Sequence, residues 1–498
     1  MKAKNILIIL CILSISFSSA QSKNIFLNRA YWKTNPSIVD IDQKIKEGHD
    51  VAQLSSSVFD AVSWALIEKV DNKTVKYLLT QKGNDVNKLT HDGRTYIFWA
   101  AYKGNLSMMQ YLVSKGAKTD IIDSHGYSVL NFAATTGQLD TKLYDFCIEN
   151  GANVIKEKNH SGANALLLVA PFIKDVKLID YFTSKGLDLH STDNNGNGIF
   201  NYAAKKGNIK LLRQLIDLGV SHQKLNSENG NAMLFACQGT RGHTNTLEVY
   251  EFLESVGINP NVTTKTGTTP LHRIAYRNKN LSIYNYFISK DVDPNQTNED
   301  GNTALMNASN GNDLSIVSYL AKRTKAINYQ NNDGKSALTY AISKNNVDVV
   351  EFLIKNGADV HVTDKDGNNL MYYITKAYNP KKDEDLNKKA ALLKAKGINL
   401  ITKQASGNSL YHIAAQTNNI ETLKFIEQFV NPSDINQSNN DGLTALHIAT
   451  MKAKNTDVLK HLLATGADKS IKTNFGETVY DLAKENELLV NSNIDFLK

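Results

Sequence analysis

The sequence predicts an all-α solenoid, a row of stacked helix–turn–helix units that runs through almost the whole chain. Two observations carry this prediction: a glycine-centred block recurs about every 34 residues, and apolar residues keep fixed places within each block. With 498 residues, 42% of them hydrophobic and 21% charged, the chain has the composition of a globular protein. We therefore expect one elongated repeat array in place of the roughly three domains that length alone suggests.

Each block is anchored by a glycine, and successive anchoring glycines are 33 to 40 residues apart. One copy reads HDGRTYIFWAAYKGN from His91, and another reads NDGLTALHIATMKAKN from Asn440. Such regular spacing indicates one structural unit that is repeated and stacked. The anchoring glycines are Gly93, Gly126, Gly162, Gly196, Gly230, Gly267, Gly301, Gly334, Gly367, Gly407, Gly442 and Gly476.

Fixed columns within the blocks predict two helices per unit. Four residues after the glycine every copy is apolar or aromatic, and seven residues after it eight of the twelve copies carry alanine. A small residue lets a helix approach its neighbour closely, while a larger apolar residue fills the space between layers. A second helical pattern follows, as in VDVVEFLIKNGADV ending at Val360, and a glycine ends it. Each unit is thus turn, first helix, short connection, second helix and glycine stop.

The pattern resembles the ankyrin repeat family. Thr269-Pro270-Leu271-His272 matches the family's signature in full, and Thr444-Ala445-Leu446-His447 is a near copy. The resemblance covers about residues 56–498 and implies an ankyrin-repeat solenoid of about 13 helix–turn–helix repeats with short β-turn fingers. The block FWAAYKGN at Phe98–Asn105 is similar to exported ankyrin-repeat proteins of Bacteroidota-type bacteria.

Four segments are expected along the chain. Residues 1–20 have the pattern of a signal peptide, because Lys2 and Lys4 precede an apolar run and Ala20 ends a small-residue cleavage site. An N-terminal cap or half repeat follows over residues 21–55, then the ankyrin array over residues 56–474 and a C-terminal capping repeat over residues 475–498. We expect export to the periplasm or secretion, and no transmembrane segment in the mature chain.

Two departures from the repeat stand out. The unit from Ala163 to Leu187 is the weakest, with Pro171 just after its first helix. The interval between Gly367 and Gly407 holds about seven extra residues around Tyr378–Leu386, for which a solvated loop and a lengthened helix start are both open.

Residues that resemble catalytic or metal sites are explained better by repeat structure. Gly334-Lys335-Ser336 ends like a phosphate-binding loop, but Tyr329 stands where that motif needs a glycine. Asp364 and Asp366 lack the other ligands of a calcium loop. No two histidines are closer than 14 residues, so no helix carries a zinc-binding histidine pair. We expect no enzyme activity, no cofactor and no metal.

The remaining histidines and cysteines also have structural interpretations. His272, His412 and His447 occupy the signature position, where the resemblance implies hydrogen bonds across repeat turns. Cys147 and Cys237 fall in apolar columns and lie three repeats apart. At about 10 Å per layer they are too distant for a disulfide.

Basic residues gather on the first helices. Nine and ten residues after the glycines there are seven basic residues and one acid, whereas the chain without residues 1–20 has 54 basic and 49 acidic residues. Two interpretations are open: ordinary solvated helix positions, or a basic, aromatic-studded groove for an acidic protein surface. Aromatic residues six positions after the glycines, such as Trp99 and Phe132, are expected to pack between helices. The candidate partner-binding residues are Arg94, Tyr102, Lys103, Lys205, Lys206, Tyr276, Arg277 and Lys344.

The predicted function is that of a non-enzymatic, exported scaffold, which binds another protein through its concave face and acts as a monomer. The overall charge is too mild to indicate nucleic acid. Two alternatives remain open. One is a periplasmic accessory protein that protects or matures a partner enzyme, for example a catalase, as the resemblance implies for some relatives. The other is a secreted effector or immunity protein.

Overall fold

The computed structural model describes residues 24–498, so the expected signal peptide at residues 1–20 lies outside the described residues. Within that range the chain is built of α-helices and short 3-10 helices, and its β pairing is confined to two isolated bridges. The chain divides into two compact units, one reaching to Asn194 and one running from Asn195 to Lys498. None of the described helices is long and apolar enough to cross a membrane.

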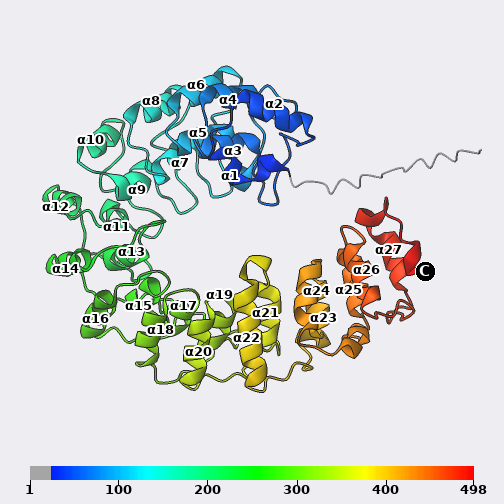
Figure 1. Ribbon diagram of the computed structural model, residues 1–498. Helices are drawn as coiled ribbons and strands as arrows, with labels where there is room; N and C mark the ends of the chain where they lie inside the picture. Colours follow the sequence, from blue (N-terminus) through cyan, green and yellow to red (C-terminus); the bar gives the residue numbers. More distant parts are fainter. Residues whose placement is uncertain (1–23) are drawn as a thin grey trace, which may run out of the picture. The chain divides into compact units, whose positions relative to one another are not determined.

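The first unit has two layers of helices. Its first helices α3, α5, α7 and α9 pack on one another in chain order, and its second helices lie on the outer side of that row (Figure 1). A short N-terminal pair, α1 and α2, precedes them. The helices of this unit are α1 (Arg29–Trp32), α2 (Ile38–Lys46), α3 (Ala61–Ile67), α4 (Asn72–Leu78), α5 (Tyr96–Tyr102), α6 (Leu106–Ser114), α7 (Val129–Thr135), α8 (Thr141–Glu149), α9 (Ala165–Val169) and α10 (Lys177–Ser184).

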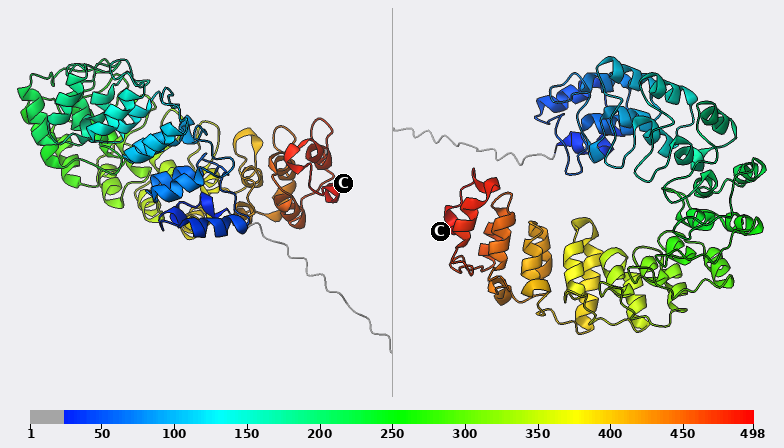
Figure 2. Two further views of the ribbon diagram at one scale, coloured as in Figure 1. Left: turned by 90° about the horizontal axis from the view of Figure 1, so that it is seen from above. Right: turned by 180° about the vertical axis from the view of Figure 1, so that it is seen from behind.

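The second unit repeats the same arrangement over a longer stretch. Its first helices are the odd-numbered ones from α11 to α27, and each packs on the next along the row. From α11 to α20 the second helices line the outer side (Figures 1 and 2). The helices are α11 (Ile199–Ala204), α12 (Ile209–Asp217), α13 (Ala232–Gln238), α14 (Leu247–Ser255), α15 (Pro270–Ile274), α16 (Leu281–Ser289), α17 (Ala304–Ser309), α18 (Leu314–Ala321), α19 (Ala337–Lys344), α20 (Val347–Lys355), α21 (Leu370–Ala377), α22 (Asp383–Ala395), α23 (Leu410–Ala415), α24 (Ile420–Glu427), α25 (Ala445–Lys452), α26 (Asp457–Ala464) and α27 (Val479–Glu485).

The predicted columns form the core. Ala341 and Leu338, the seventh and fourth residues after Gly334, are both fully buried in α19. Since the same two columns recur in every repeat, most first helices present alanine to their neighbour and an apolar residue to the space between layers. Fully buried members of the two columns include Ile97, Leu130, Leu166, Leu271, Ala100, Ala133, Ala308, Ala414 and Ala449.

Polar side chains open the first helices. The Thr269 hydroxyl oxygen accepts from the backbone N–H of His272, and Pro270 occupies the first helical position, where no N–H is needed. Where the proline is absent, Ser336 and Asn369 accept from backbone N–H groups of the first turn in the same manner. The signature proline is therefore one of several ways in which this chain starts a helix.

Both departures from the repeat have structural counterparts. In the weak unit, α9 is only five residues long and gives way to a 3-10 turn that contains Pro171. The extra residues after Gly367 form a 3-10 turn at Pro380–Lys382 and lengthen α22 to 13 residues. The lengthened helix start, rather than a purely solvated loop, is thus the form that the insertion takes.

Candidate binding surface

The turns between repeats are held by a side-chain acceptor three residues before the glycine. The amide oxygen of Asn331 accepts from the backbone N–H groups of Asp333 and Lys335 at 3.0 and 2.9 Å. The next residue, Asn332, donates its backbone N–H to the carbonyl oxygen of Asp300 in the preceding turn at 3.0 Å. Successive turns are thereby tied into a ladder beside the first helices. The same acceptor position is occupied by Asp123, Asn159, Asn298, Asp364 and Asn439.

The structure supports the turn interpretation of the two motif-like segments. Gly334 has a φ of +75°, and a Cβ there would lie 2.5 Å from the backbone nitrogen of Lys365. Its role is thus a tight turn against the next repeat. The Asp364 carboxylate accepts from backbone N–H groups of its own turn and from the hydroxyl of Tyr373. Hydrogen bonding to its charged form lowers the pKa of Asp364, against the opposing effect of burial.

Three of the eight candidate residues are exposed side chains of the second unit. Tyr276 is 47% exposed, and Arg277 and Lys344 are exposed as well. Tyr276 and Arg277 lie in the turn that follows α15 and its C-cap residue Ala275, while Lys344 is the last residue of α19. Neither cation forms an ion pair with any residue in the described part of the chain. These side chains can therefore contact a partner without breaking an internal ion pair.

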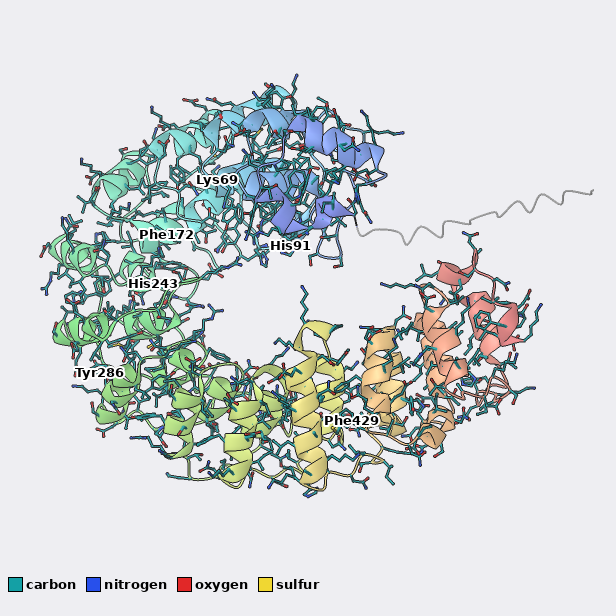
Figure 3. The ribbon with its side chains drawn as sticks, viewed as in Figure 1. Lys69, His91, Phe172, His243, Tyr286 and Phe429 are labelled. Atoms are coloured by element: carbon teal, nitrogen blue, oxygen red, sulfur yellow. The ribbon has the colours of Figure 1, made fainter. Side chains whose placement is uncertain are left out.

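Two candidates of the first unit form a half-buried pair at the end of α5. The Lys103 ammonium lies 4.8 Å from the ring centroid of Tyr102, within the range of a cation–π contact. Burial lowers the pKa of Lys103, and the positive charge of Lys69 adds to the effect. Lys69, which is labelled in Figure 3, is exposed. The two lysines give this end of the unit a local excess of positive charge.

Lys205 and Lys206 of the second unit are also half-buried. The Lys205 ammonium lies 4.8 Å from the ring centroid of Tyr202 and 5.3 Å from that of Phe235. The two rings belong to the neighbouring first helices α11 and α13, and their centroids are 5.7 Å apart. Lys205 therefore lies over aromatic rings of two repeats rather than extending freely into solvent.

Arg94 does not have the exposed position that a partner-binding residue needs. Only 7% of it is exposed, because its guanidinium donates to Asp123 at 2.7 Å and to Asp92 at 3.0 Å. The guanidinium carbon also lies 4.3 Å from the ring centroid of Phe132 and 5.4 Å from that of Trp99. Arg94 joins two turns and two first helices of the first unit, so we leave it out of the binding surface.

The aromatic column six residues after the glycines contributes mainly to packing. Trp99, Phe132 and Tyr202 are only 4 to 7% exposed, as expected for side chains that fill the space between helices. Tyr340 and Tyr373 are half-buried, and their hydroxyls donate to Asn302 and Asp364, respectively. These two rings lie at the edge of the packed layer and connect first helices to turns.

Two exposed arginines, one in α15 and one in the loop after α13, were not predicted from the sequence. Arg273 lies in α15, six residues after Gly267, where most other copies have an aromatic or aliphatic residue. Arg241 lies in the loop after α13, in a tight turn closed by backbone hydrogen bonds between Thr240 and His243. His243, at the base of this turn, is labelled in Figure 3. Two features of the sequence could have indicated them. Arg273 interrupts a column of mostly aromatic and aliphatic residues, and the interval of 37 residues after Gly230 is longer than most others.

Two of the three signature histidines, His272 and His412, connect turns, as the family resemblance implied. His272 donates from Nε2 to the carbonyl oxygen of Asn302 at 2.9 Å, and His412 donates to that of Leu443 at 2.8 Å. His447 accepts the backbone N–H of its own N-cap residue through Nδ1 at 3.0 Å. Burial lowers the pKa of all three histidines, so the neutral form is favoured in the folded chain.

The two cysteines of the described chain are free and buried, as predicted. Burial raises the pKa of the Cys147 thiol to about 12 and also raises that of Cys237. Since the thiolate is the nucleophile, a thiol with a raised pKa is a structural group. Among residues 24–498, no three His, Cys, Asp or Glu side chains lie close enough together to hold a metal ion.

Comparison with known proteins agrees with this architecture. A family described as "Ankyrin repeats (3 copies)" matches residues 63–158, 271–364 and 377–483. Phosphocholine transferase AnkX of Legionella pneumophila is 27% identical over 146 residues, which is 29% of this chain and 15% of that protein. Protein phosphatase 1 regulatory subunit 27 of Mus musculus is 30% identical over 98 residues, 20% of this chain and 62% of that protein. Notch-regulated ankyrin repeat-containing protein B of Danio rerio is 30% identical over 96 residues, 19% of this chain and 86% of that protein.

The matched segments cover more than half of the chain, which therefore belongs to the ankyrin-repeat family. Ankyrin repeats generally mediate protein–protein interaction, and proteins built from them are typically non-enzymatic scaffolds. The chain spans a small part of AnkX and less than two thirds of the phosphatase subunit. What it shares with these relatives is the repeat architecture.

Proposed function

We propose that this protein is an exported, non-enzymatic scaffold that binds a partner protein through its first helices and the adjoining turns. The observation that carries the proposal is the group of exposed Tyr276, Arg277 and Lys344 at the ends of first helices. Tyrosine and arginine are enriched among the residues that dominate the binding energy of protein interfaces. We further propose that the partner presents an acidic surface and that the scaffold itself is a monomer.

Export is part of the same proposal. The positively charged start, the apolar run and the small residues before Gln21 together have the pattern of a cleaved signal peptide. The sequence resemblance to exported ankyrin-repeat proteins of Bacteroidota-type bacteria supports a destination in the periplasm or outside the cell. The partner would then be an exported or envelope protein.

A second candidate function is that of an accessory protein of an enzyme. It is favoured by the alignment with a regulatory subunit of protein phosphatase 1, since that relative's name describes a partner of an enzyme. On this proposal the partner held by the first helices is itself an exported enzyme, which the scaffold protects or matures.

Affinity purification tests the proposed function. The tagged mature chain is purified from envelope extract together with a variant in which Tyr276, Arg277 and Lys344 are changed to alanine. We expect a stoichiometric partner with the unchanged chain and a strongly reduced amount with the variant, although both fold equally. Equal recovery of the same partner by both chains would contradict binding through the first helices.

A further inference from the structure

We propose that the second unit carries an arginine strip, formed by Arg241, Arg273, Tyr276 and Arg277, that binds a carboxylate-rich segment of the partner protein. This inference rests on the proposed function and names the site and the chemistry of recognition. The strip comprises the loop after α13, the last turn of α15 and the turn that follows α15. These two first helices pack on each other, so their C-terminal ends are neighbours along the row.

The charge of the arginine strip is not neutralised within the chain. None of its three guanidinium groups forms an ion pair with another residue among the described 24–498. Carboxylates of the nearby turns behave differently: Asp333 lies 3.1 Å from the Lys335 ammonium and 2.6 Å from that of Lys365. Asp333 thus has internal partners, whereas the three arginines are left to interact with a ligand.

The three arginines follow or lie in two first helices that pack on each other, α13 and α15. Arg273 lies in α15, and Arg277 lies in the turn that follows the helix, where its backbone N–H donates to the carbonyl oxygen of Ile274 at 3.1 Å. Arg241 stands in a tight turn after Gly239, whose φ of 62° and ψ of −156° are accessible essentially to glycine alone. Because the turn is closed by backbone hydrogen bonds, the backbone at Arg241 is ordered before any ligand arrives.

The residue types of the strip favour carboxylates. A planar guanidinium forms two parallel hydrogen bonds with one carboxylate, and such charge-assisted pairs are stronger than neutral ones. Tyr276, 47% exposed between two arginines, adds a large and rigid contact surface. The strip therefore fits Asp or Glu side chains of a partner, with the tyrosine ring packing on the segment that carries them.

Neighbouring acids argue against a nucleic acid as the ligand. Glu299 and Asp300 are exposed on the turn of the next repeat, and the negative charge of Asp300 contributes to raising the pKa of Tyr276 after the larger effect of burial. A continuous phosphate backbone would meet these carboxylates at close range, and like charges repel. A short acidic segment of a protein can end before it reaches them.

A titration of the full mature chain tests this inference. The probe is a fluorescein-labelled peptide of alternating glutamate and glycine, measured by anisotropy at low and at high salt. The test variant combines R241E, R273E and R277E. The control combines K210E, K322E and K355E, which change the charge equally at exposed positions on or at the ends of the outer helices α12, α18 and α20. Circular dichroism establishes that all three chains are folded.

We expect the unchanged chain and the control to bind the peptide, and the arginine variant to lose about tenfold or more in affinity at low salt. The difference should shrink at high salt, because screening weakens exposed charges. Absence of peptide binding, or equal binding by the two variants, would overturn the strip. Tighter binding of a single-stranded DNA oligonucleotide through the same arginines would overturn the choice of a protein partner. If a partner protein binds to the first helices but the peptide does not bind, the arginine strip is wrong as the binding site. The proposed function is not contradicted by that result.

Discussion

The side-chain amide of Asn312 donates a hydrogen bond of 2.8 Å to the backbone carbonyl oxygen of Ala275 in the preceding repeat. It also donates to the carbonyl of Asn278 at 2.9 Å, and only 2% of Asn312 is exposed. The end of each first helix leaves carbonyl groups without helical partners. Amides from the following repeat satisfy them, so neighbouring layers are joined by buried hydrogen bonds as well as by apolar packing. Gln138, Asn245, Asn345 and Asn486 make the same kind of contact.

Removal of one such amide should weaken the array. We expect Asn312→Ala to lower the free energy of unfolding of the second unit by about 1–3 kcal/mol, because the buried Ala275 carbonyl loses its side-chain donor and that of Asn278 keeps only the Tyr284 hydroxyl. Urea denaturation followed by circular dichroism measures the change. Ser282→Ala, at an exposed position of α16, is the control and should change stability by no more than about 0.5 kcal/mol. Equal effects of the two substitutions would show that the amide does not join the layers.

The insertion replaces this amide by a buried lysine. Lys389 of α22 is 2% exposed, and its ammonium donates to the carbonyls of Ile342 and Asn345 at the end of α19. The Asp385 carboxylate lies 2.8 Å from the same ammonium and partly balances its charge. Burial lowers the pKa of Lys389, against the opposing effect of Asp385.

We expect Lys389→Ala to destabilise the second unit by about 2–3 kcal/mol, since it leaves hydrogen-bond acceptors and a carboxylate without their partner. The neighbouring Lys388 provides a matched control, because its ammonium pairs with Glu384 in solvent at 2.7 Å. Exposed pairs contribute about 1 kcal/mol or less. Thermal unfolding of both alanine variants makes the comparison, and a larger loss at Lys388 would be inconsistent with the structural role of Lys389.

The repeat columns could be predicted because burial recurs with the period of the sequence. Ala341 and Leu338 occupy core positions for the same reason as their counterparts in every other repeat. Arg94 could not be placed in this way, because its environment depends on Asp92 and Asp123 meeting from two successive turns. Such contacts form between repeats, and a local sequence pattern does not predict them.

The buried lysine and the arginine strip could not be predicted from the sequence, for related reasons. Lys389 lies in an insertion, so its position in the repeat cannot be counted from the preceding glycine. Its partners are backbone carbonyl groups, which do not depend on residue type. Arg241 lies in a loop of irregular length, and Arg273 stands in a column that was assigned to packing. Both arginines become recognisable as surface residues only when α13 and α15 are placed side by side.

The signature histidines make stability depend on pH. In the folded chain the pKa of each of His272, His412 and His447 lies below the ordinary value of 6.5. Between the two values the unfolded chain binds more protons than the folded chain. The free energy of unfolding is therefore at its full value above about pH 6.5 and falls as the pH drops toward the folded-state pKa.

We expect the urea midpoint of the second unit to decrease between pH 7 and pH 5, and this decrease to be smaller in the triple variant H272Q, H412Q and H447Q. Protonation of His272 would also break the hydrogen bond in which its Nδ1 accepts the N–H of Thr269. The exposed His361 is the control, since His361→Gln removes a histidine without removing a turn contact. An unchanged pH profile in the triple variant would exclude these histidines as its cause.

The proposed export predicts a defined mature terminus. If the positively charged start, apolar run and Ala20 form a cleaved signal peptide, the native protein begins at Gln21. Replacing two apolar residues of the run, Ile8 and Leu10, by lysine should block cleavage and leave the protein inside the cell. Intact mass and N-terminal sequencing of native material measure the terminus. Recovery of the chain from the envelope with Met1 still present would contradict cleavage.

The most direct test of binding through the first helices is site-specific photo-cross-linking in cells that produce the protein. A photoreactive phenylalanine replaces Tyr276 in one chain and Lys322, at the end of the outer helix α18, in the other. Both positions are exposed in the second unit, so accessibility to solvent is matched. We predict a discrete covalent adduct with one partner from the Tyr276 position and none from the Lys322 position. An adduct from Lys322 alone, or the same adduct in equal amount from both positions, would contradict the account.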